Sequence, residues 1–212
     1  EYLYEIVKDG DIIGVSWGTT IYNMALNLKH KALKGVQIVQ LKGGISHSQS
    51  NTYAYEVVEL FSEAFSTVGR YLPLPVMFDT AQIKELIERD KHIKKILDLG
   101  RQANIAVFTV GTVKNDALLF RLGYIDKKDR DIIQNRAVGD ICSRFIDAQG
   151  NICDKELDER TVGIKLEDLK EKEKRVLVAG SKRKISAIKA TLVGEIANIL
   201  ITDQYTAQEL LK

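Results

Sequence analysis

Short apolar runs alternate along the chain with segments in which apolar residues recur at helical spacing. The runs lie at 11–17, 36–41, 104–111, 175–180 and 197–203. Runs of this kind, bounded by glycine or polar residues, are typical of strands buried on both faces of a parallel sheet. The intervening pattern predicts helices at about 21–28, 52–65, 81–102 and 183–192. The alternation therefore predicts an α/β fold with a mainly parallel sheet and helices on both of its faces.

Two parts of the chain depart from this alternation. Segment 72–78 is apolar but contains Pro73 and Pro75, the two prolines of the chain. Because proline cannot donate to a sheet ladder, this segment is expected to be an edge strand or an extended loop. The charged stretch 118–169 predicts a smaller inserted subdomain, or lid, packed over the ligand end of the sheet. Residues 1–212 are expected to form one domain with such a lid.

A lysine and two glycines end the second apolar run, in the sequence Gln40-Leu41-Lys42-Gly43-Gly44. Ligands of open α/β sheets bind beyond the carboxyl ends of the strands, and Lys42 occupies such an end. A desolvated lysine favours its neutral amine, the nucleophile that captures a sugar aldehyde as a Schiff base. On this segment alone, a solvated lysine where a strand reaches the surface is the simpler interpretation.

Three strand ends carry groups that can bind phosphate. The candidate residues are Gly18, Thr19, Thr20, Gly43, Gly44 and Lys184. The first three open a helix, where free N–H groups and the helix dipole attract anions, although threonines there are often ordinary caps. The two later glycines can cradle an anion or make a simple tight turn, and Lys184 can place a charge on phosphate or remain solvated. Three such ends in one parallel sheet predict a shared crevice.

Several other residues are candidates for roles in this crevice. Asp79 and Asp140 are candidates for holding sugar hydroxyls, although turn or helix-cap roles are commoner for aspartate. His47 can assist chemistry, but a lone loop histidine more often does not. Cys142 is expected to be an inert packing thiol. Trp17 is expected in the core or as a wall of the pocket.

Composition limits the classes of binding partner and the cellular compartment to be expected for this chain. A formal net charge of +2 gives the chain no strong nucleic-acid footprint, and no stretch approaches the ~20 apolar residues that span a bilayer. The two cysteines are not at metal-ligand spacing, so neither a metal nor another cofactor is expected. Two cysteines in a chain of this size fit a reducing cytoplasm. The chain begins without Met and is expected to be a segment of a longer protein.

Four motifs occur in order along the chain and together resemble one protein family. They are Gly14–Thr20, Gln40–Gly44, Val138–Phe145, and Ala179-Gly180 followed by Lys184. Over its whole length the chain resembles the sugar-binding, effector-responsive domain of SorC-family bacterial transcriptional regulators. Within that family, a lysine before the double glycine is distinctive of deoxyribonucleoside regulators. One departure is Ser181, where the family commonly has a second glycine.

The resemblance implies a Rossmann-like sheet with a smaller subdomain, similar to sugar-phosphate isomerases and CoA transferases. It implies a phosphorylated sugar as effector, with its phosphate at Gly18, Thr19, Thr20 and Lys184. For the lysine-containing members the implied effector is deoxyribose-5-phosphate, whose aldehyde would form an imine with Lys42. It also implies a helix-turn-helix that precedes this domain and binds operator DNA, from which effector capture releases the full-length repressor. A homo-oligomer, dimer or tetramer, is expected because such regulators read paired half-sites.

Two other functions stay open at this point. A sugar-phosphate isomerase or an aldolase-type lyase would use the same lysine, and a lyase would also need an acid/base relay around the imine. The two aspartates and the histidine do not exclude such an enzyme. A non-covalent sugar-phosphate sensor would use Lys42 only to pair with an anion.

Overall fold

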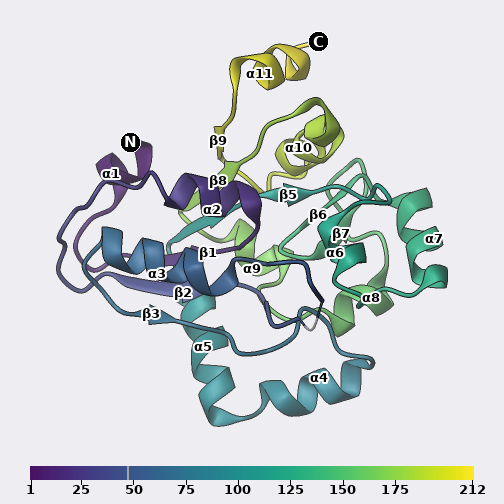
Figure 1. The fold of residues 1–212 in the computed structure, drawn as a ribbon, viewed down its shortest axis with the longest axis horizontal. Helices are drawn as coiled ribbons and strands as arrows, with labels where there is room; N and C mark the ends of the chain where they lie inside the picture. The colour runs from purple at the N-terminus through teal and green to yellow at the C-terminus, as the bar shows by residue number, and fades with distance from the viewer. Residues whose placement is uncertain (47) are drawn as a thin grey trace.

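Six parallel strands form the main sheet of the computed structural model, which describes residues 1–46 and 48–212 (Figure 1). In spatial order they are β3 (Gly69–Arg70), β2 (Gln37–Gln40), β1 (Ile12–Val15), β4 (Ile105–Phe108), β8 (Lys174–Val178) and β9 (Ile199–Ile201). Every neighbouring pair is parallel, so the carboxyl ends of these strands share one edge of the sheet. The parallel α/β sheet expected from the apolar runs is confirmed.

Both faces of this sheet are covered by helices. They are α2 (Thr19–Ala25) and α3 (Ala54–Ala64) on one face, and α9 (Leu166–Lys170) and α10 (Ile185–Val193) on the other. Val107 of β4 packs with the first pair, and its neighbour Phe108 packs with the second. Successive side chains of a strand point to opposite faces. A strand buried on both faces therefore has a continuous apolar sequence, as this chain has.

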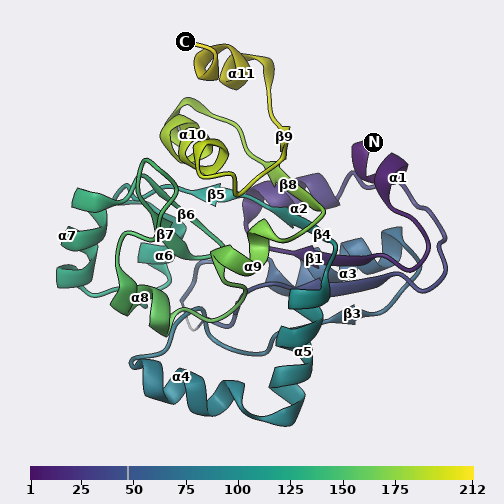
Figure 2. The ribbon, with the colours of Figure 1, turned by 180° about the vertical axis from the view of Figure 1, so that it is seen from behind.

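A second, antiparallel sheet continues from the end of β4. Its strands are β5 (Val110–Gly111), β6 (Gly139–Ile141) and β7 (Arg144–Ile146), and the helices around it are α6 (Leu118–Arg121), α7 (Lys127–Arg136) and α8 (Lys155–Arg160). Phe120, Ile133 and Phe145 belong to a separate apolar cluster, which Trp17 joins from the end of β1. These elements lie to one side of the main sheet (Figure 2).

The apolar run 104–111 is not one strand but two. Its first part is β4, which ends at Phe108, and its second part is β5. Val110 pairs with Ile141 of the second sheet, so the chain changes sheets at Thr109. That change places Thr109 at the carboxyl edge of the main sheet.

The predicted helix 81–102 is likewise divided, into α4 (Ala81–Glu88) and α5 (Lys91–Gln102). The Asp90 carboxylate accepts hydrogen bonds from the N–H groups of His92 and Ile93, at 2.8 and 3.3 Å. A capping aspartate of this kind starts a new helix. α5 contacts β2 and β1 of the sheet, and α4 lies beyond it (Figure 1).

The proline-containing segment 72–78 is an extended loop, one of the two alternatives expected. Pro75 and Met77 make only isolated bridges, to Ile45 and Thr161. The edge strands of the main sheet are β3 and β9 instead.

The remaining elements are α1 (Tyr2–Ile6), the 3₁₀ turn η1 (Lys182–Lys184) and α11 (Gln204–Leu210). The helix expected at 183–192 thus begins with η1 and continues as α10. Within residues 1–46 and 48–212, none of the helices has the length and hydropathy required to cross a bilayer.

Candidate functional site

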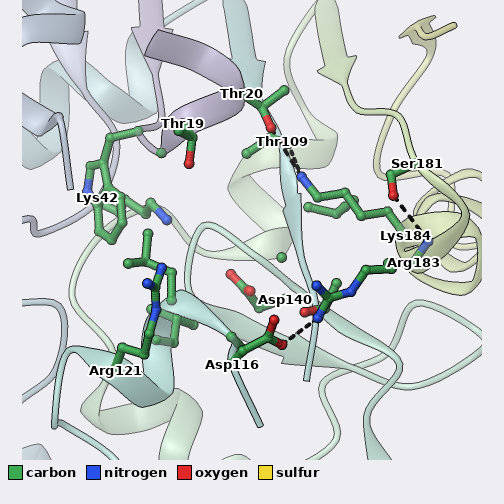
Figure 3. Close-up of a pocket in the computed structure, with 18 residues that line it drawn as sticks. Thr19, Thr20, Lys42, Thr109, Asp116, Arg121, Asp140, Ser181, Arg183 and Lys184 are labelled. Atoms are coloured by element: carbon green, nitrogen blue, oxygen red, sulfur yellow. Dashed lines mark hydrogen bonds and ion pairs between the residues drawn. The ribbon is translucent and has the colours of Figure 1, made fainter. Parts of the chain in front are cut away.

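A cavity of about 380 Å³ opens at the carboxyl edge of the main sheet (Figure 3). Among the residues that line it are six candidates from the sequence: Gly18, Thr19, Thr20, Lys42, Asp140 and Lys184. They come from the segments that follow β1, β2 and β8, and from β6 of the second sheet. The structure therefore brings four separate parts of the chain together around one crevice.

The Lys42 side chain is buried beside this cavity, with 5 % of its surface exposed. Its Nζ lies 3.3 Å from Ser143 Oγ and 3.6 Å from the centroid of the Trp17 ring. Burial lowers the pKa of Lys42 below the ordinary lysine value, and the nearby Asp140 carboxylate opposes that shift without cancelling it. The neutral, nucleophilic amine is therefore favoured.

The segment at Gly163 and Ile164 pairs with the backbone at Leu41 and Lys42 and holds it in place. Ile164 donates its N–H to the Leu41 carbonyl oxygen at 2.8 Å, and Lys42 forms an antiparallel bridge with Gly163. Gly163 has φ of +123°, and a Cβ there would lie 2.4 Å from Leu41 O, so the position requires glycine. The buried Arg144 guanidinium donates to the carbonyl oxygens of Gly163 and Ile164, at 2.9 and 2.7 Å.

The Asp140 carboxyl group lies between Lys42 and Lys184, which enter the cavity from opposite sides (Figure 3). Asp140 Oδ2 accepts a hydrogen bond from the Ser143 N–H at 3.1 Å. Burial raises the pKa of Asp140, while the two lysines act in the opposite direction. A Cβ on Gly111 would lie 1.8 Å from Asp140 Oδ1, so only glycine leaves room for this carboxyl group.

Lys184 faces the start of α2 across the cavity. Its Nζ lies 3.2 Å from Thr20 Oγ1 and 3.5 Å from Thr109 Oγ1. Burial lowers the pKa of Lys184, and Asp140 opposes the shift. Gly18, at φ of +128°, turns the chain into α2, whose first N–H groups have no acceptor within the helix. An amine, two hydroxyls and helix-start N–H groups are together suited to an anion.

Gly43 and Gly44, which the sequence analysis proposed for phosphate binding, do not line this cavity. Gly43 donates its N–H to Val162 O at 3.3 Å, and Gly44 donates its N–H to Leu74 O at 2.9 Å. A Cβ on Gly43 would lie 1.9 Å from Pro75 O. The two glycines therefore allow close packing behind Lys42, and their N–H groups are already used.

Asp79, the other aspartate proposed for a sugar hydroxyl, is not brought to the cavity either. Asp79 is exposed in the turn before α4 and does not line the cavity, so Asp140 is the aspartate of the predicted pair that does. The hydroxyl of Thr80 caps α4 by accepting a hydrogen bond from the Ile83 N–H. His47, the candidate loop histidine, lies outside the described residues.

The sequence analysis missed several residues that line the cavity. Thr109 lies just beyond the end of β4, and Thr19 lies beyond the end of β1. This shared position at a strand end could have indicated Thr109 as a cavity residue. Arg183 stands beside Lys184 in a basic run, and it forms an ion pair with Asp116 (Figure 3). No sequence pattern pointed to Asp116, because its position depends on how the chain folds after β5.

The structure also shows the surroundings of three further residues named in the sequence analysis. Trp17 is both core and pocket wall, since it is buried in the apolar cluster of Phe120, Ile133 and Phe145 and also lines the cavity. Burial raises the pKa of Cys142 to about 11, which keeps this packing thiol protonated. Ser181 has φ of +100°, a conformation that favours the glycine common there in the family it resembles. In the described part of the chain, no three His, Cys, Asp or Glu residues are grouped so as to hold a metal ion.

Comparison with known proteins identifies the family. Residues 1–212 match the family model described as "Putative sugar-binding domain". The chain is 57% identical over 211 residues to the deoxyribonucleoside regulator of Bacillus subtilis, covering 100% of this chain and 67% of that protein. It is similar to the full-length sorbitol operon regulator SorC from Klebsiella pneumoniae, with a TM-score of 0.91, 25% identity, and coverage of 100% of this chain and 70% of that one.

A further solved structure agrees with these matches. It is a domain of a possible sugar-binding transcriptional regulator from Arthrobacter aurescens TC1, with a TM-score of 0.91, 29% identity, and coverage of 100% and 82% of the two chains. The chain belongs to the family of sugar-binding domains of SorC-type transcriptional regulators. It is the effector domain of a regulator and not an enzyme. It spans about two thirds of the length of the curated relatives that it matches.

Substitution of Gly111 tests whether Asp140 needs the space beside it. We expect Gly111→Ala to displace the Asp140 carboxyl group and to lower the free energy of unfolding by about 1–3 kcal/mol, because the added methyl group overpacks a buried site. Urea denaturation measures the change. Gly100→Ala in α5 is the control, because its Cβ would make only an ordinary contact of 3.6 Å with Leu41. If both variants have the stability of the unsubstituted chain, the steric role of Gly111 is wrong.

Proposed function

We propose that this domain captures the open-chain form of deoxyribose-5-phosphate as a Schiff base on Lys42. The observation that carries the proposal is the buried amine of Lys42 at one side of a cavity whose opposite side holds Lys184 and Thr20 (Figure 3). Such a cavity suits a ligand with an aldehyde at one end and a phosphate at the other. The name of the Bacillus subtilis relative, deoxyribonucleoside regulator, supports this choice of sugar.

The capture reaction joins Lys42 Nζ to the aldehyde carbon with loss of one water. The neutral amine attacks the carbonyl carbon, and a proton passes from nitrogen to the carbonyl oxygen to give a carbinolamine. A second proton converts the carbinolamine hydroxyl into water, which leaves as the C=N bond forms. Asp140 is suited to supply that proton, because burial raises its pKa.

The product of this reaction is a protonated imine, which carries a positive charge. The face of the Trp17 ring lies 3.6 Å from Nζ, and an aromatic face at this position stabilises a cation by about 0.5–2 kcal/mol. The Asp140 carboxylate left after proton transfer also stabilises the cation. The cavity therefore favours the neutral form of Lys42 before capture and accommodates a cation after it.

Trp17 also supports a sugar that lacks a hydroxyl at C2. The indole Nε1–H is donated to Gly43 O at 2.9 Å, so the ring offers the Lys42 side only its apolar face. C2 is the carbon next to the imine, and a hydroxyl left there without a partner would cost about 1–3 kcal/mol. Asp140 can accept a hydrogen bond from a hydroxyl further along the sugar.

The phosphate would lie between Lys184 and the start of α2. A bound phosphate would favour the charged form of Lys184, because a neighbouring anion raises the pKa of a lysine that burial lowers. Thr20 and Thr109 supply hydroxyl donors. The N–H groups at the start of α2 and the dipole of its first turn add to the attraction. The role proposed for Gly18, Thr19 and Thr20 is therefore to bind phosphate together with Lys184.

In the full-length protein, effector capture would release operator DNA. We assign the operator contact to the part of the protein beyond this domain, since the chain spans about two thirds of its regulator relatives. An effector shifts the equilibrium only if it binds the operator-free conformation more tightly. A homo-oligomer, dimer or tetramer, fits paired operator half-sites, and a cytoplasmic location fits operator DNA as the target.

Borohydride reduction tests the covalent step. With deoxyribose-5-phosphate present, we expect one reduced adduct per chain, mapped to Lys42 by peptide mass spectrometry, and none in Lys42→Ala. Lys172→Met is the matched control, because Lys172 is also buried with a lowered pKa but does not line the cavity. Binding without an adduct would contradict Schiff-base capture and favour the non-covalent sensor. Release of acetaldehyde over many turnovers would contradict the sensor role itself.

Removal of the Lys184 charge tests the phosphate end separately. Lys184→Ala is expected to weaken binding of deoxyribose-5-phosphate by about 1.5–3 kcal/mol, roughly 10- to 150-fold, because a charged hydrogen bond to phosphate is lost. Binding of free deoxyribose should be unchanged, and isothermal titration calorimetry measures both. Lys182→Ala is the control, since Lys182 is exposed and does not line the cavity. An equal loss for both ligands in Lys184→Ala would refute the phosphate role.

A further inference from the structure

The turn that joins β6 to β7 has an unusual backbone. Its two central residues, Cys142 and Ser143, both have positive φ, at +49° and +70°. Two-residue hairpin turns of this type favour asparagine and glycine, because a side chain is strained in the left-handed region. Ser143 nevertheless occupies the second position, and it is fully buried. Strained residues of this kind persist where the surrounding structure holds them, and they are concentrated at functional sites.

Ser143 contacts both of the reactive groups of the cavity. Its Oγ lies 3.3 Å from Lys42 Nζ, and its N–H donates to Asp140 Oδ2 at 3.1 Å. Lys42 and Asp140 line the cavity, whereas Ser143 is not among the residues that line it. Ser143 therefore contacts the amine and the carboxyl group from outside the cavity lining.

We propose that Ser143 is a positioning residue that orients the Lys42 lone pair toward the ligand, an inference that rests on the proposed Schiff-base function. A neutral lysine amine has two N–H bonds and one lone pair. One N–H donates to Ser143 Oγ, and the other faces the Trp17 ring. The lone pair is then directed into the cavity, where the aldehyde carbon would lie.

The same hydroxyl remains useful after capture. The protonated imine retains one N–H on nitrogen, and Ser143 Oγ can accept it. Meanwhile the Ser143 N–H holds Asp140, the group suited to protonate the carbinolamine hydroxyl. One strained turn thus fixes the nucleophile through a side chain and the acid through the main chain.

The variant Ser143→Gly tests the contribution of the hydroxyl apart from that of the backbone N–H. Glycine suits φ of +70° and keeps the N–H that holds Asp140, but it removes the hydroxyl. We expect a melting temperature equal to or above that of the unsubstituted chain. The rate of borohydride-trappable adduct formation with deoxyribose-5-phosphate should fall by about 10- to 100-fold, as for a misplaced reacting group. The rate is measured across a pH series and compared at the pH of maximal rate for each variant, so that a changed protonation state of Lys42 does not account for the difference.

Two further variants complete the test. Ser143→Ala also lacks the hydroxyl but keeps the strain, so it should show the same loss of rate with no gain in melting temperature. Ser66→Gly is the matched control, because Ser66 has φ of +52° and is exposed away from the cavity; its capture rate should not change. Binding of the non-aldehyde analogue 2-deoxyribitol-5-phosphate reports whether the cavity is intact.

The outcomes distinguish this inference from the proposed function. A wild-type capture rate in Ser143→Gly or Ser143→Ala would overturn the positioning role and leave Schiff-base capture standing. Loss of analogue binding in both variants would also overturn it, because the role would then be structural. If the unsubstituted chain forms no adduct, the proposed function fails first.

Discussion

Burial of the Lys42 amine is the constraint on which the rest of the site depends. A buried ammonium is costly unless a carboxylate pairs with it. Among the described contacts of Lys42, the direct partners of Nζ are the Ser143 hydroxyl and the Trp17 ring. This environment favours the uncharged amine, and it keeps a nucleophile ready at the edge of the cavity. In the proposed function, this amine would let a regulator detect a sugar without consuming it.

The segments around Lys42 hold it there through interactions that involve distant parts of the chain. Arg144 is almost fully buried and makes five N–H···O contacts to residues 158–164. That segment in turn pairs with the backbone at Leu41 and Lys42. Arg144 directly follows Ser143, so the residue that fixes the scaffold is the chain neighbour of the residue that contacts the amine. Loss of this guanidinium would leave several buried carbonyl groups without donors.

The sequence predicted the sheet and several residues that line the cavity, because both depend on local patterns. Lys42, Gly18 and Lys184 follow apolar runs, and the ends of parallel strands meet at one edge. The role of the double glycine could not be read in the same way, because the acceptors of its N–H groups, Leu74 and Val162, are remote in sequence. Ser143 was missed because its place depends on two consecutive left-handed residues.

The dependence of capture on pH tests the central claim, that burial lowers the pKa of Lys42 and so favours its neutral amine. The measurement is the rate of borohydride-trappable adduct formation at saturating deoxyribose-5-phosphate, followed as the pH is raised. Only the neutral amine attacks, so the rate rises with pH through the pKa of Lys42, which burial lowers. The account predicts that this rise ends well below the ordinary lysine pKa of about 10.4. Ionisation of Asp140, the proposed acid, then lowers the rate again. A rate that still rises through the ordinary lysine pKa would show a solvated amine and would contradict the account.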